Sequence, residues 1–370
     1  MKKNTFFMFA LPVFVTALWL PTLEAQLVAA RTAPEQKIVG GPYVVNAGPQ
    51  RAVLTWLVQT GEVSLSDEPG KAAKTVPILK AEKIVFSGLK PGKTYYYESF
   101  PGEGGRGSFK TPSTGPSQFQ FVVFGDTRTR HDVHGAVINA VLKYAKPDFV
   151  MHVGDLVADG LDTSQWPIFF DIERELLRQA AFFPALGNHE RNATNFYDYL
   201  DAKPYYSFDW GSAHFVVIDS DIENVGETQA QKDTFWREQT NWLRMDLKLS
   251  QKADLRFVFA HHPPMTAVER RQGDNPHMTA LEPMFEEYRV SAAFFGHDHN
   301  YQHYLKDGVH YFITGGGGAP LYDVNTPPPG ITKKVESIEN FVIVNVNGSN
   351  AHIEGRKVDG GILDTTEMHQ

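Results

Sequence analysis

The sequence contains no cysteine among its 370 residues. Disulfide bonds, thiolate metal ligands and cysteine nucleophiles are therefore excluded. Basic residues are outnumbered as well, with 35 Lys and Arg against 43 Asp and Glu and a formal net charge of −8. This balance argues against a protein that binds duplex nucleic acid, which needs a basic face. It leaves small phosphorylated substrates open, because bound metal ions reverse the local sign of the charge.

Long hydrophobic runs are also scarce. The stretch Phe6–Leu20 is mostly apolar, yet it falls short of the roughly 20 residues needed to span a bilayer. Lys2 and Lys3 precede it, and small residues at positions 25–30 offer cleavage points. We therefore predict a signal peptide at residues 1–30 and a secreted or periplasmic protein with no stable membrane insertion. The alternative is an uncleaved membrane anchor.

The length of the chain suggests two domains. Residues 36–112 hold short runs of β-forming residues separated by turn residues, which predicts an all-β sandwich. Within it, the phrases Ala52–Trp56 and Leu89–Tyr97 look like parts of a fibronectin type III domain. From residue 118 to residue 356, strand and helix patterns alternate, as in a catalytic α/β domain. Residues 357–370 are predicted to form a C-terminal tail.

Five short polar clusters are spread over residues 124–299. They are Phe124–Arg128, Gly154–Leu156, Gly187–Glu190, His261–Pro264 and Gly296–His299. Four of the five follow an apolar, strand-like run, so they fall on loops at the carboxyl ends of strands, where open α/β sheets build their sites. Alone, each cluster is more often a turn or a structural feature. Together they predict a metal site whose carboxylate, amide and histidine ligands suit Mn or Fe(III) and accept Zn or Fe(II).

This ordered set of five clusters resembles the calcineurin-like metallophosphoesterase superfamily. Within that superfamily, the chain is most similar to the purple acid phosphatase-like branch, over roughly residues 36–355. The resemblance implies an α/β fold in which a two-sheet αββα metallophosphoesterase sandwich follows the all-β fibronectin III-like sandwich. It also implies two metal ions per chain, either Fe, Mn or Zn, at the edge between the two sheets.

The resemblance assigns a role to each cluster. Matched to the family pattern, Asp155 bridges the two ions, Asp126 and His299 bind the first ion, and Asn188, His261 and His297 bind the second. Two positions depart from the pattern, because Ala158 stands where purple acid phosphatases carry a tyrosine and Arg128 where many members carry a histidine. The first ion is then completed by water, or by His131 or His134. Without that tyrosine, we do not expect a purple protein.

Three further residues are predicted to act on the substrate. His189 matches the phosphate-contacting histidine of the family and is expected to stabilise the transition state or to protonate the leaving oxygen. Its alternative role is a hydrogen bond to the bridging carboxylate. Arg128 is expected to fork onto a phosphoryl group, or else to pair with Asp132 or Asp159. His277 stands where purple acid phosphatases place substrate-contacting histidines.

The expected function is that of a metal-dependent phosphoric ester hydrolase. The first hypothesis is an acid phosphatase-like enzyme that hydrolyses small phosphate monoesters by attack of a metal-bound hydroxide. The second is a phosphodiesterase or nucleotide hydrolase of the same superfamily. The sequence hardly separates these two hypotheses, because substrate selectivity depends on pocket walls supplied by loops such as Asn192–Lys203 and Thr266–His277. A hypothesis of another class makes the chain a surface-binding protein with a vestigial metal site. The sequence does not indicate the oligomeric state.

Overall fold

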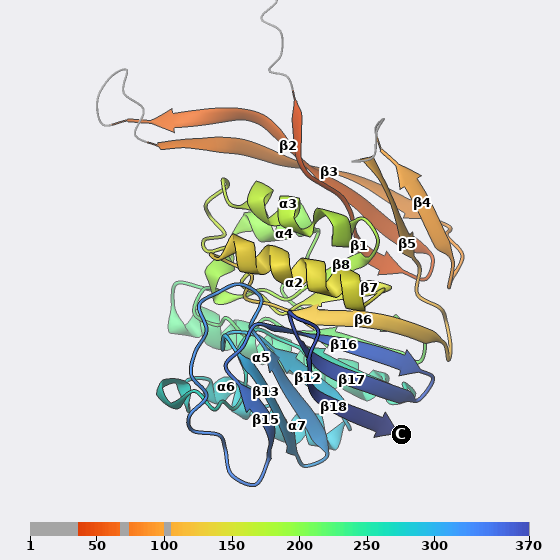
Figure 1. Ribbon diagram of the computed structural model, residues 1–370, viewed down its shortest axis with the longest axis vertical. Helices are drawn as coiled ribbons and strands as arrows, with labels where there is room; N and C mark the ends of the chain where they lie inside the picture. The colour runs from red at the N-terminus through yellow and green to blue at the C-terminus, as the bar shows by residue number, and fades with distance from the viewer. Residues whose placement is uncertain (1–35, 67–73, 100–104, 370) are drawn as a thin grey trace, which may run out of the picture. The chain divides into compact units, whose positions relative to one another are not determined.

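The computed structural model describes residues 36–66, 74–99 and 105–369, so the predicted signal peptide lies outside the described residues. A nine-stranded sheet forms the first of two large layers (Figure 1). In sheet order its strands are β18 (Ile362–His369), β17 (Asn350–Lys357), β16 (Asn340–Asn347), β6 (Gln118–Phe124), β7 (Phe149–His152), β8 (Ala181–Pro184), β1 (Lys37–Gly48), β2 (Arg51–Leu65) and β3 (Lys74–Ser87).

A seven-stranded sheet forms the second layer. In sheet order its strands are β15 (Thr332–Glu336), β13 (Tyr301–Lys306), β14 (Val309–Thr314), β12 (Ala292–Phe295), β11 (Leu255–Phe259), β10 (Ala213–Val217) and β9 (Tyr206–Trp210). A separate two-stranded ribbon pairs β4 (Thr94–Glu98) with β5 (Arg106–Lys110). Both large sheets are mixed, since parallel pairs sit beside antiparallel ones.

Helices cover the outer face of each large sheet. The first sheet packs against α2 (His131–Tyr144), α3 (Trp166–Leu177) and α4 (Thr194–Leu200). The second packs against α5 (Gln229–Leu249), α6 (Pro276–Thr279) and α7 (Glu282–Glu287). The predicted αββα arrangement of two sheets between helices is thereby confirmed (Figure 1). None of the helices in the described part of the chain combines the length and the apolar character needed to cross a bilayer.

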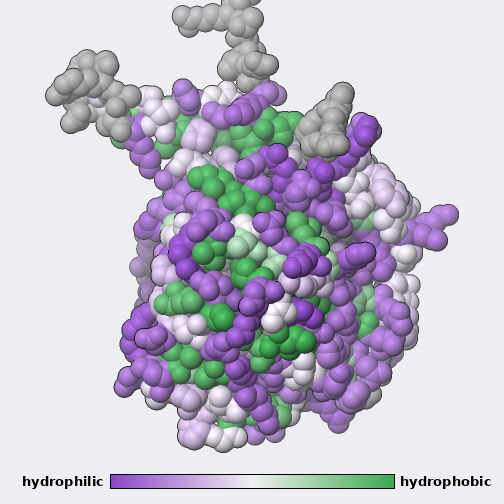
Figure 2. All heavy atoms as spheres, viewed as in Figure 1, coloured by the Kyte–Doolittle hydropathy of each residue, from purple (hydrophilic) through white to green (hydrophobic). Residues whose placement is uncertain are grey.

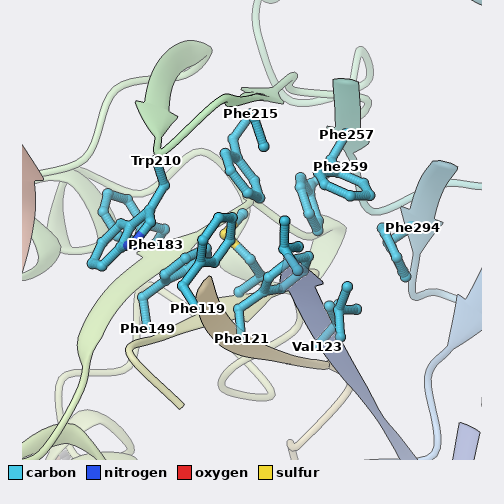
Figure 3. Packing of buried hydrophobic residues seen from close by; sticks show 14 of the residues in the cluster. Phe119, Phe121, Val123, Phe149, Phe183, Trp210, Phe215, Phe257, Phe259 and Phe294 are labelled. Carbon is cyan, nitrogen blue, oxygen red and sulfur yellow. The ribbon is translucent and has the colours of Figure 1, made fainter. Parts of the chain in front are cut away.

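An aromatic core fills the space between the two sheets (Figure 3). The alternation of side chains along β6 explains it: Phe119, Phe121 and Val123 pack into this core, whereas Val122 and Phe124 pack under the helices. Each fully buried side chain of this kind contributes about 1.5–3 kcal/mol of transfer free energy. The sheets are therefore held face to face, and the loops at their strand ends have a rigid support.

The N-terminal region is rich in β-structure, as predicted. Its strands, however, continue the first large sheet, because Val44 of β1 pairs in parallel with Ala181 of β8. One sheet thus contains strands from both sides of residues 112–118. The division there into a separate sandwich and a catalytic domain stays a prediction. Hydrophobic patches interrupt the largely polar face in Figure 2, and β3 exposes Ile84 and Val85.

The end of the chain differs from the expected tail. Residues 362–369 form β18, which pairs antiparallel with β17 along its whole length. Met368 is buried in the core between the sheets and helps to anchor this strand. The polar and β-branched residues between positions 364 and 367 gave only a weak apolar alternation, so the sequence did not indicate an edge strand.

Parallel pairing determines where the five polar clusters lie. β6, β7 and β8 are neighbouring parallel strands, and β11 and β12 form another parallel pair. Because the carboxyl ends of parallel strands share one edge of a sheet, the loops that follow these five strands come together.

Candidate metal centre

The backbone at three of the strand ends adopts an unusual conformation. Asp126, Asp155 and His297 have positive φ angles of 57°, 57° and 67°. Such a conformation costs a non-glycine residue on the order of 1–3 kcal/mol and persists only where the surrounding structure enforces it. Gly296 allows the loops to approach each other, because a Cβ there would lie 2.5 Å from Asp126 Oδ2. The fold therefore holds these side chains in place at the expense of local strain.

Four polar atoms converge on one side of the centre. Nε2 of His261 lies 3.0 Å from Asn188 Oδ1, 3.3 Å from His297 Nδ1 and 3.3 Å from Asp155 Oδ1. His297 Nδ1 lies 3.1 Å from the same Asn188 oxygen. We call these donor atoms of Asn188, His261, His297 and Asp155 the histidine cluster.

The histidine cluster fits a metal ion. Four tetrahedral donors about 2.0–2.1 Å from an ion lie about 3.3–3.4 Å apart, close to the 3.0–3.3 Å that separate His261 Nε2 from the other three atoms. His261 donates its Nδ1 proton to the backbone oxygen of Val153 at 2.8 Å, which leaves the Nε2 lone pair facing the cluster. Burial keeps the pKa of His297 well below its usual range, so its imidazole is neutral and able to ligate.

The other side of the centre contains a cation of the protein itself. Asp126, Asp155 and His299 offer three ligand atoms within 4.8 Å of one another. Arg128 lies against two of them, with its Nε 3.2 Å from Asp155 Oδ2 and its Nη2 3.4 Å from His299 Nε2. We call Asp126, Asp155, His299 and Arg128 together the arginine cluster. An ion does not fit this group as it fits the histidine cluster, because a guanidinium already faces two of its three donors.

The two buried carboxylates shift in opposite directions. Burial raises the pKa of Asp126 well above its usual range. Burial alone would also raise the pKa of Asp155, but the neighbouring His261, His189 and Arg128 outweigh it and lower that pKa to about 2. Asp155 is thus the permanently charged carboxylate of the pair, in agreement with its place between the two clusters.

His299 faces the centre in the same way as His261. It donates its Nδ1 proton to the backbone oxygen of Pro320 at 2.7 Å and presents Nε2, which lies 3.4 Å from Asp126 Oδ1. Burial lowers its pKa to about 4. Its ring stacks on Tyr322, with 4.1 Å between the ring centroids. All six predicted metal ligands therefore lie in one place, although their roles stay predictions.

His189 lies at the rim of this centre. Its Nδ1 donates to the backbone oxygen of Ala158 at 2.8 Å, and its Nε2 lies 4.0 Å from Asp155 Oδ2. The imidazole is about a third exposed, at 32%. The residue that replaces the family's tyrosine therefore supports His189 through its backbone, and the free ring nitrogen faces the carboxylate.

The salt-bridge alternative for Arg128 was right in kind and wrong in partner. Arg128 pairs with Asp155, whereas Asp159 pairs with Arg191 at 3.3 Å. Its side chain is only 14% exposed, so it is directed into the centre and not along the surface loop. The predicted contact with a phosphoryl group stays a prediction.

Two other histidines are not directed at the centre. His134, which we considered as a further ligand of the first ion, is buried and bonds to Glu173 at 2.8 Å, so that alternative is wrong. His277 donates from Nε2 to the backbone oxygen of Ser220 at 3.0 Å and lies edge-on to Trp236. Its predicted contact with substrate stays a prediction. The sequence gave no sign of either hydrogen bond, because Glu173 and Ser220 lie far from these histidines along the chain.

Glu190 is a functional residue that the sequence analysis missed. Its buried carboxylate accepts hydrogen bonds from the backbone N–H groups of Asp155, Leu156, Val157 and Gly187, at 2.8–3.2 Å. It thereby ties the loop of the bridging carboxylate to the loop that carries the asparagine ligand. Its place directly after Asn-His was the one available signal.

A run of four glycines, Gly315–Gly318, was also missed. Gly317 donates to the backbone oxygen of Gly125 at 3.0 Å, and Ala319 donates to that of Asp126 at 2.7 Å. A Cβ at Gly317 would lie 2.2 Å from the Gly125 oxygen, so only glycine fits there. The run supports the loop of the first aspartate from behind.

Arg271 brings a second guanidinium to the centre. It contacts Nε2 of His297 and lies 5.0 Å above the ring of Tyr322, and Arg270 lies 4.4 Å above the same ring. The predicted pocket loop Thr266–His277 therefore reaches the site through its arginines. The sequence named the loop but not these side chains.

The chain is similar to several known proteins. The profile of the calcineurin-like phosphoesterase family matches residues 119–301. A purple acid phosphatase of Glycine max is 26% identical over 266 residues, which cover 63% of this chain and 55% of that protein. A nucleotide pyrophosphatase/phosphodiesterase of Hordeum vulgare is 25% identical over 229 residues, covering 49% and 60%. A probable inactive purple acid phosphatase 1 of Arabidopsis thaliana is 24% identical over 274 residues, covering 57% and 43%.

The chain thus spans about half the length of the curated relatives that it matches. Among solved structures, a purple acid phosphatase from yellow lupin seeds superposes with a TM-score of 0.69 at 16% identity, covering 89% of this chain and 74% of that one. The structure of PhoD superposes with a TM-score of 0.60 at 12% identity, covering 90% and 88%. These superpositions show a common fold. Residues 119–301 thus match the profile of the calcineurin-like phosphoesterase family, and the chain is similar to purple acid phosphatases in sequence and in fold.

Proposed function

We propose that the chain is a secreted metal-dependent phosphatase that hydrolyses small phosphate monoesters. One observation carries this proposal: three donor atoms, of Asn188, His297 and Asp155, lie 3.0–3.3 Å from His261 Nε2, beside the partly exposed His189 and the mostly buried Arg128. An ion site next to a proton carrier and a fixed positive charge is what hydrolysis of an anionic ester requires.

The residues of the centre divide the work. A bound metal ion would act as a Lewis acid on the phosphoryl group and would lower the pKa of a water molecule. Asp155, which is ionised and shared by both clusters, would help to hold that ion. His189 presents Nε2 at the rim, where a leaving oxygen needs its proton. Arg128 offers N–H groups to phosphoryl oxygens as negative charge develops on them.

The surroundings favour a doubly charged monoester. Arg128 and Arg271 add two permanent positive charges at the centre, and a monoester carries one more ionisable oxygen than a diester. A cavity of about 320 Å³ is lined in part by Arg270 and by Tyr322, whose ring stacks on the predicted ligand His299. We assign it to the organic part of the ester.

A second candidate is the hydrolysis of a diester or of a nucleotide pyrophosphate bond. The Hordeum vulgare relative, a nucleotide pyrophosphatase/phosphodiesterase, supports it. The hypothesis of a vestigial site finds support in relatives named as probable inactive purple acid phosphatases. The complete donor set of the histidine cluster weighs against that hypothesis.

One assay separates the three. The protein is stripped of metal, supplied with Mn, Fe, Zn or Mg in turn, and tested on p-nitrophenyl phosphate, bis-p-nitrophenyl phosphate and a nucleotide with a pyrophosphate bond. We expect metal-dependent turnover of the monoester at a kcat/KM at least about tenfold above the other two. A reversed preference would favour the second candidate. No turnover with any metal would favour the vestigial site, and the control is the same series with excess chelator.

Export is tested separately. Expression of the full chain and sequencing of the N-terminus of the exported protein should give a start between Gln26 and Arg31. A chain that keeps Lys2 and Lys3 and sediments with membranes would support the membrane anchor instead.

A further inference from the structure

Arg128 lies where the family pattern expects a ligand of the first metal ion. It stands two residues after Asp126, and its backbone N–H bonds to the oxygen of Asp155 at 3.3 Å. Its side chain turns inward, so that Nε and Nη2 face Asp155 Oδ2 and His299 Nε2 at 3.2 and 3.4 Å. These two atoms are also ligand atoms assigned to the first ion. The guanidinium therefore addresses the same donors that an ion would use.

From this contact we infer that the guanidinium of Arg128 takes the place of the first metal ion, and that the chain works with one ion, held by the histidine cluster. The inference rests on the proposed function and makes it more specific. Arginine does not lose its proton in proteins, so Arg128 acts as a fixed cation and not as a ligand. It supplies charge and hydrogen bonds to the phosphoryl group where a first ion would supply Lewis acidity.

The balance of charge supports one ion. The two clusters contain two carboxylates, Asp126 and Asp155, and both are buried. The charge of Arg271 is offset by Asp298, whose Oδ1 lies 3.4 Å from the Arg271 Nε. One divalent ion together with Arg128 already brings three positive charges to the two negative ones. A second divalent ion would raise the total to five, in a site where burial leaves little solvent to screen the repulsion. A histidine at position 128 would add no permanent charge, so a second ion would meet less repulsion there.

The number of donors supports it as well. The histidine cluster offers four donor atoms at ligand spacing. The arginine cluster offers three, one of which belongs to the shared Asp155. Ala158 supplies no side-chain ligand, and His134 is committed to Glu173. Two of the three remaining donors are in contact with Arg128, so a first ion would have to displace the guanidinium to bind.

The decisive measurement is the number of ions per chain. Metal-free full-length protein is loaded with excess Mn²⁺ or Zn²⁺, dialysed, and analysed by plasma mass spectrometry against protein concentration. We expect one ion per chain for the wild type and two for Arg128→His. Mn²⁺-loaded wild type should give the six-line electron paramagnetic resonance spectrum of an isolated Mn²⁺. The Arg128→His variant should give the broadened spectrum of a spin-coupled pair.

Arg130 provides the matched control. It lies in the same loop, but its side chain donates to the backbone oxygens of Gly318 and Ala319 and pairs with Glu339. Arg130→His therefore adds a histidine to the loop without opening the arginine cluster, and one ion per chain is expected. Two ions in Arg130→His would mean that a nearby histidine alone changes the count, which contradicts our explanation.

The outcomes separate this inference from the proposed function. Two ions in the wild type, or a single ion in folded Arg128→His, would overturn the inference. If Arg128→His does not fold, the wild-type count and its resonance spectrum decide. Hydrolysis by a two-ion wild type would reject the inference and leave the function standing. A one-ion wild type without hydrolysis would do the reverse.

Discussion

The two clusters of the metal centre share Asp155 and lie next to each other, yet one surrounds a position that suits an ion and the other contains a guanidinium. In the histidine cluster, uncharged side chains and one carboxylate oxygen point to a common position at ligand spacing. In the arginine cluster, a guanidinium lies against the other oxygen of the same carboxylate. The side chain at position 128 accounts for this difference between the two clusters. A loop position two residues from a ligand thus decides whether a site holds an ion or a protein cation.

The largest effect is expected from Asp155→Asn, because this residue belongs to both clusters. The variant should lose the bound ion, and kcat/KM should fall by about 10⁴-fold or more, since both the Lewis acid and the activated water are lost. Metal content and turnover are measured on the same preparation. Asp162→Asn is the control, because that carboxylate bonds to Ser164 in a turn outside the centre. A variant that keeps its ion and near-normal turnover would contradict the shared role.

The next largest effect is expected at His189, at the rim of the centre, and it tests whether this residue protonates the leaving oxygen. His189→Ala should leave the ion in place and lower kcat by roughly 10²–10⁴-fold for an alkyl phosphate, whose leaving oxygen needs a proton. The loss should be much smaller for p-nitrophenyl phosphate, which departs without one. Equal losses for both substrates would indicate charge stabilisation of the phosphoryl oxygens. Loss of the ion would instead make His189 part of the ion site.

A paired substitution compares the clusters directly. His261→Ala removes a donor from the histidine cluster, and the affinity for Zn²⁺ should fall by more than about 100-fold, beyond the roughly 10–100-fold cost of losing an outer hydrogen-bond partner. His299→Ala removes a donor from the arginine cluster, and the affinity should change by less than about tenfold. Isothermal titration of both variants measures the difference. Similar losses in the two variants would mean that the clusters bind ions alike.

The smallest effect concerns the folding stability of the protein and its dependence on pH. His214, on β10, bonds to Asp209 and Asp246 at 2.7 and 2.8 Å. Burial alone would lower its pKa, but the two carboxylates outweigh burial and raise it to about 9. Because the folded-state pKa exceeds the unfolded value of about 6.5, the stabilisation is complete below pH 6.5. It is lost as the pH rises through 9.

The size of this contribution is on the order of 2 kcal/mol, allowing for the exposed side chain of Asp209. Urea unfolding of the wild type should therefore show a decrease in stability between pH 6.5 and 9. His214→Gln should show a smaller decrease over the same range. An identical pH dependence in the two proteins would assign the effect to groups other than His214.

Much of the fold was predictable because its signals are local. The alternation of strands and helices that the sequence predicts after residue 118 is present, for example in β7, α3 and β8. The junction of β1 with β8 was not predictable, since it joins residues more than 130 positions apart by backbone hydrogen bonds that leave no mark on the side chains. The edge strand β18 was missed for a similar reason, because its pairing with β17 compensates for a weak apolar pattern.

The candidate site was predictable to the level of residue types. The sequence by itself determined that carboxylate, amide and imidazole donors stand directly after strands, and parallel pairing brings such positions to one edge. Only the tertiary structure decided what lies between those donors. The direction of Arg128 depends on Asp155 and His299, which are 27 and 171 residues away along the chain. A long, flexible side chain takes its rotamer from the charges packed around it, and no local pattern encodes these.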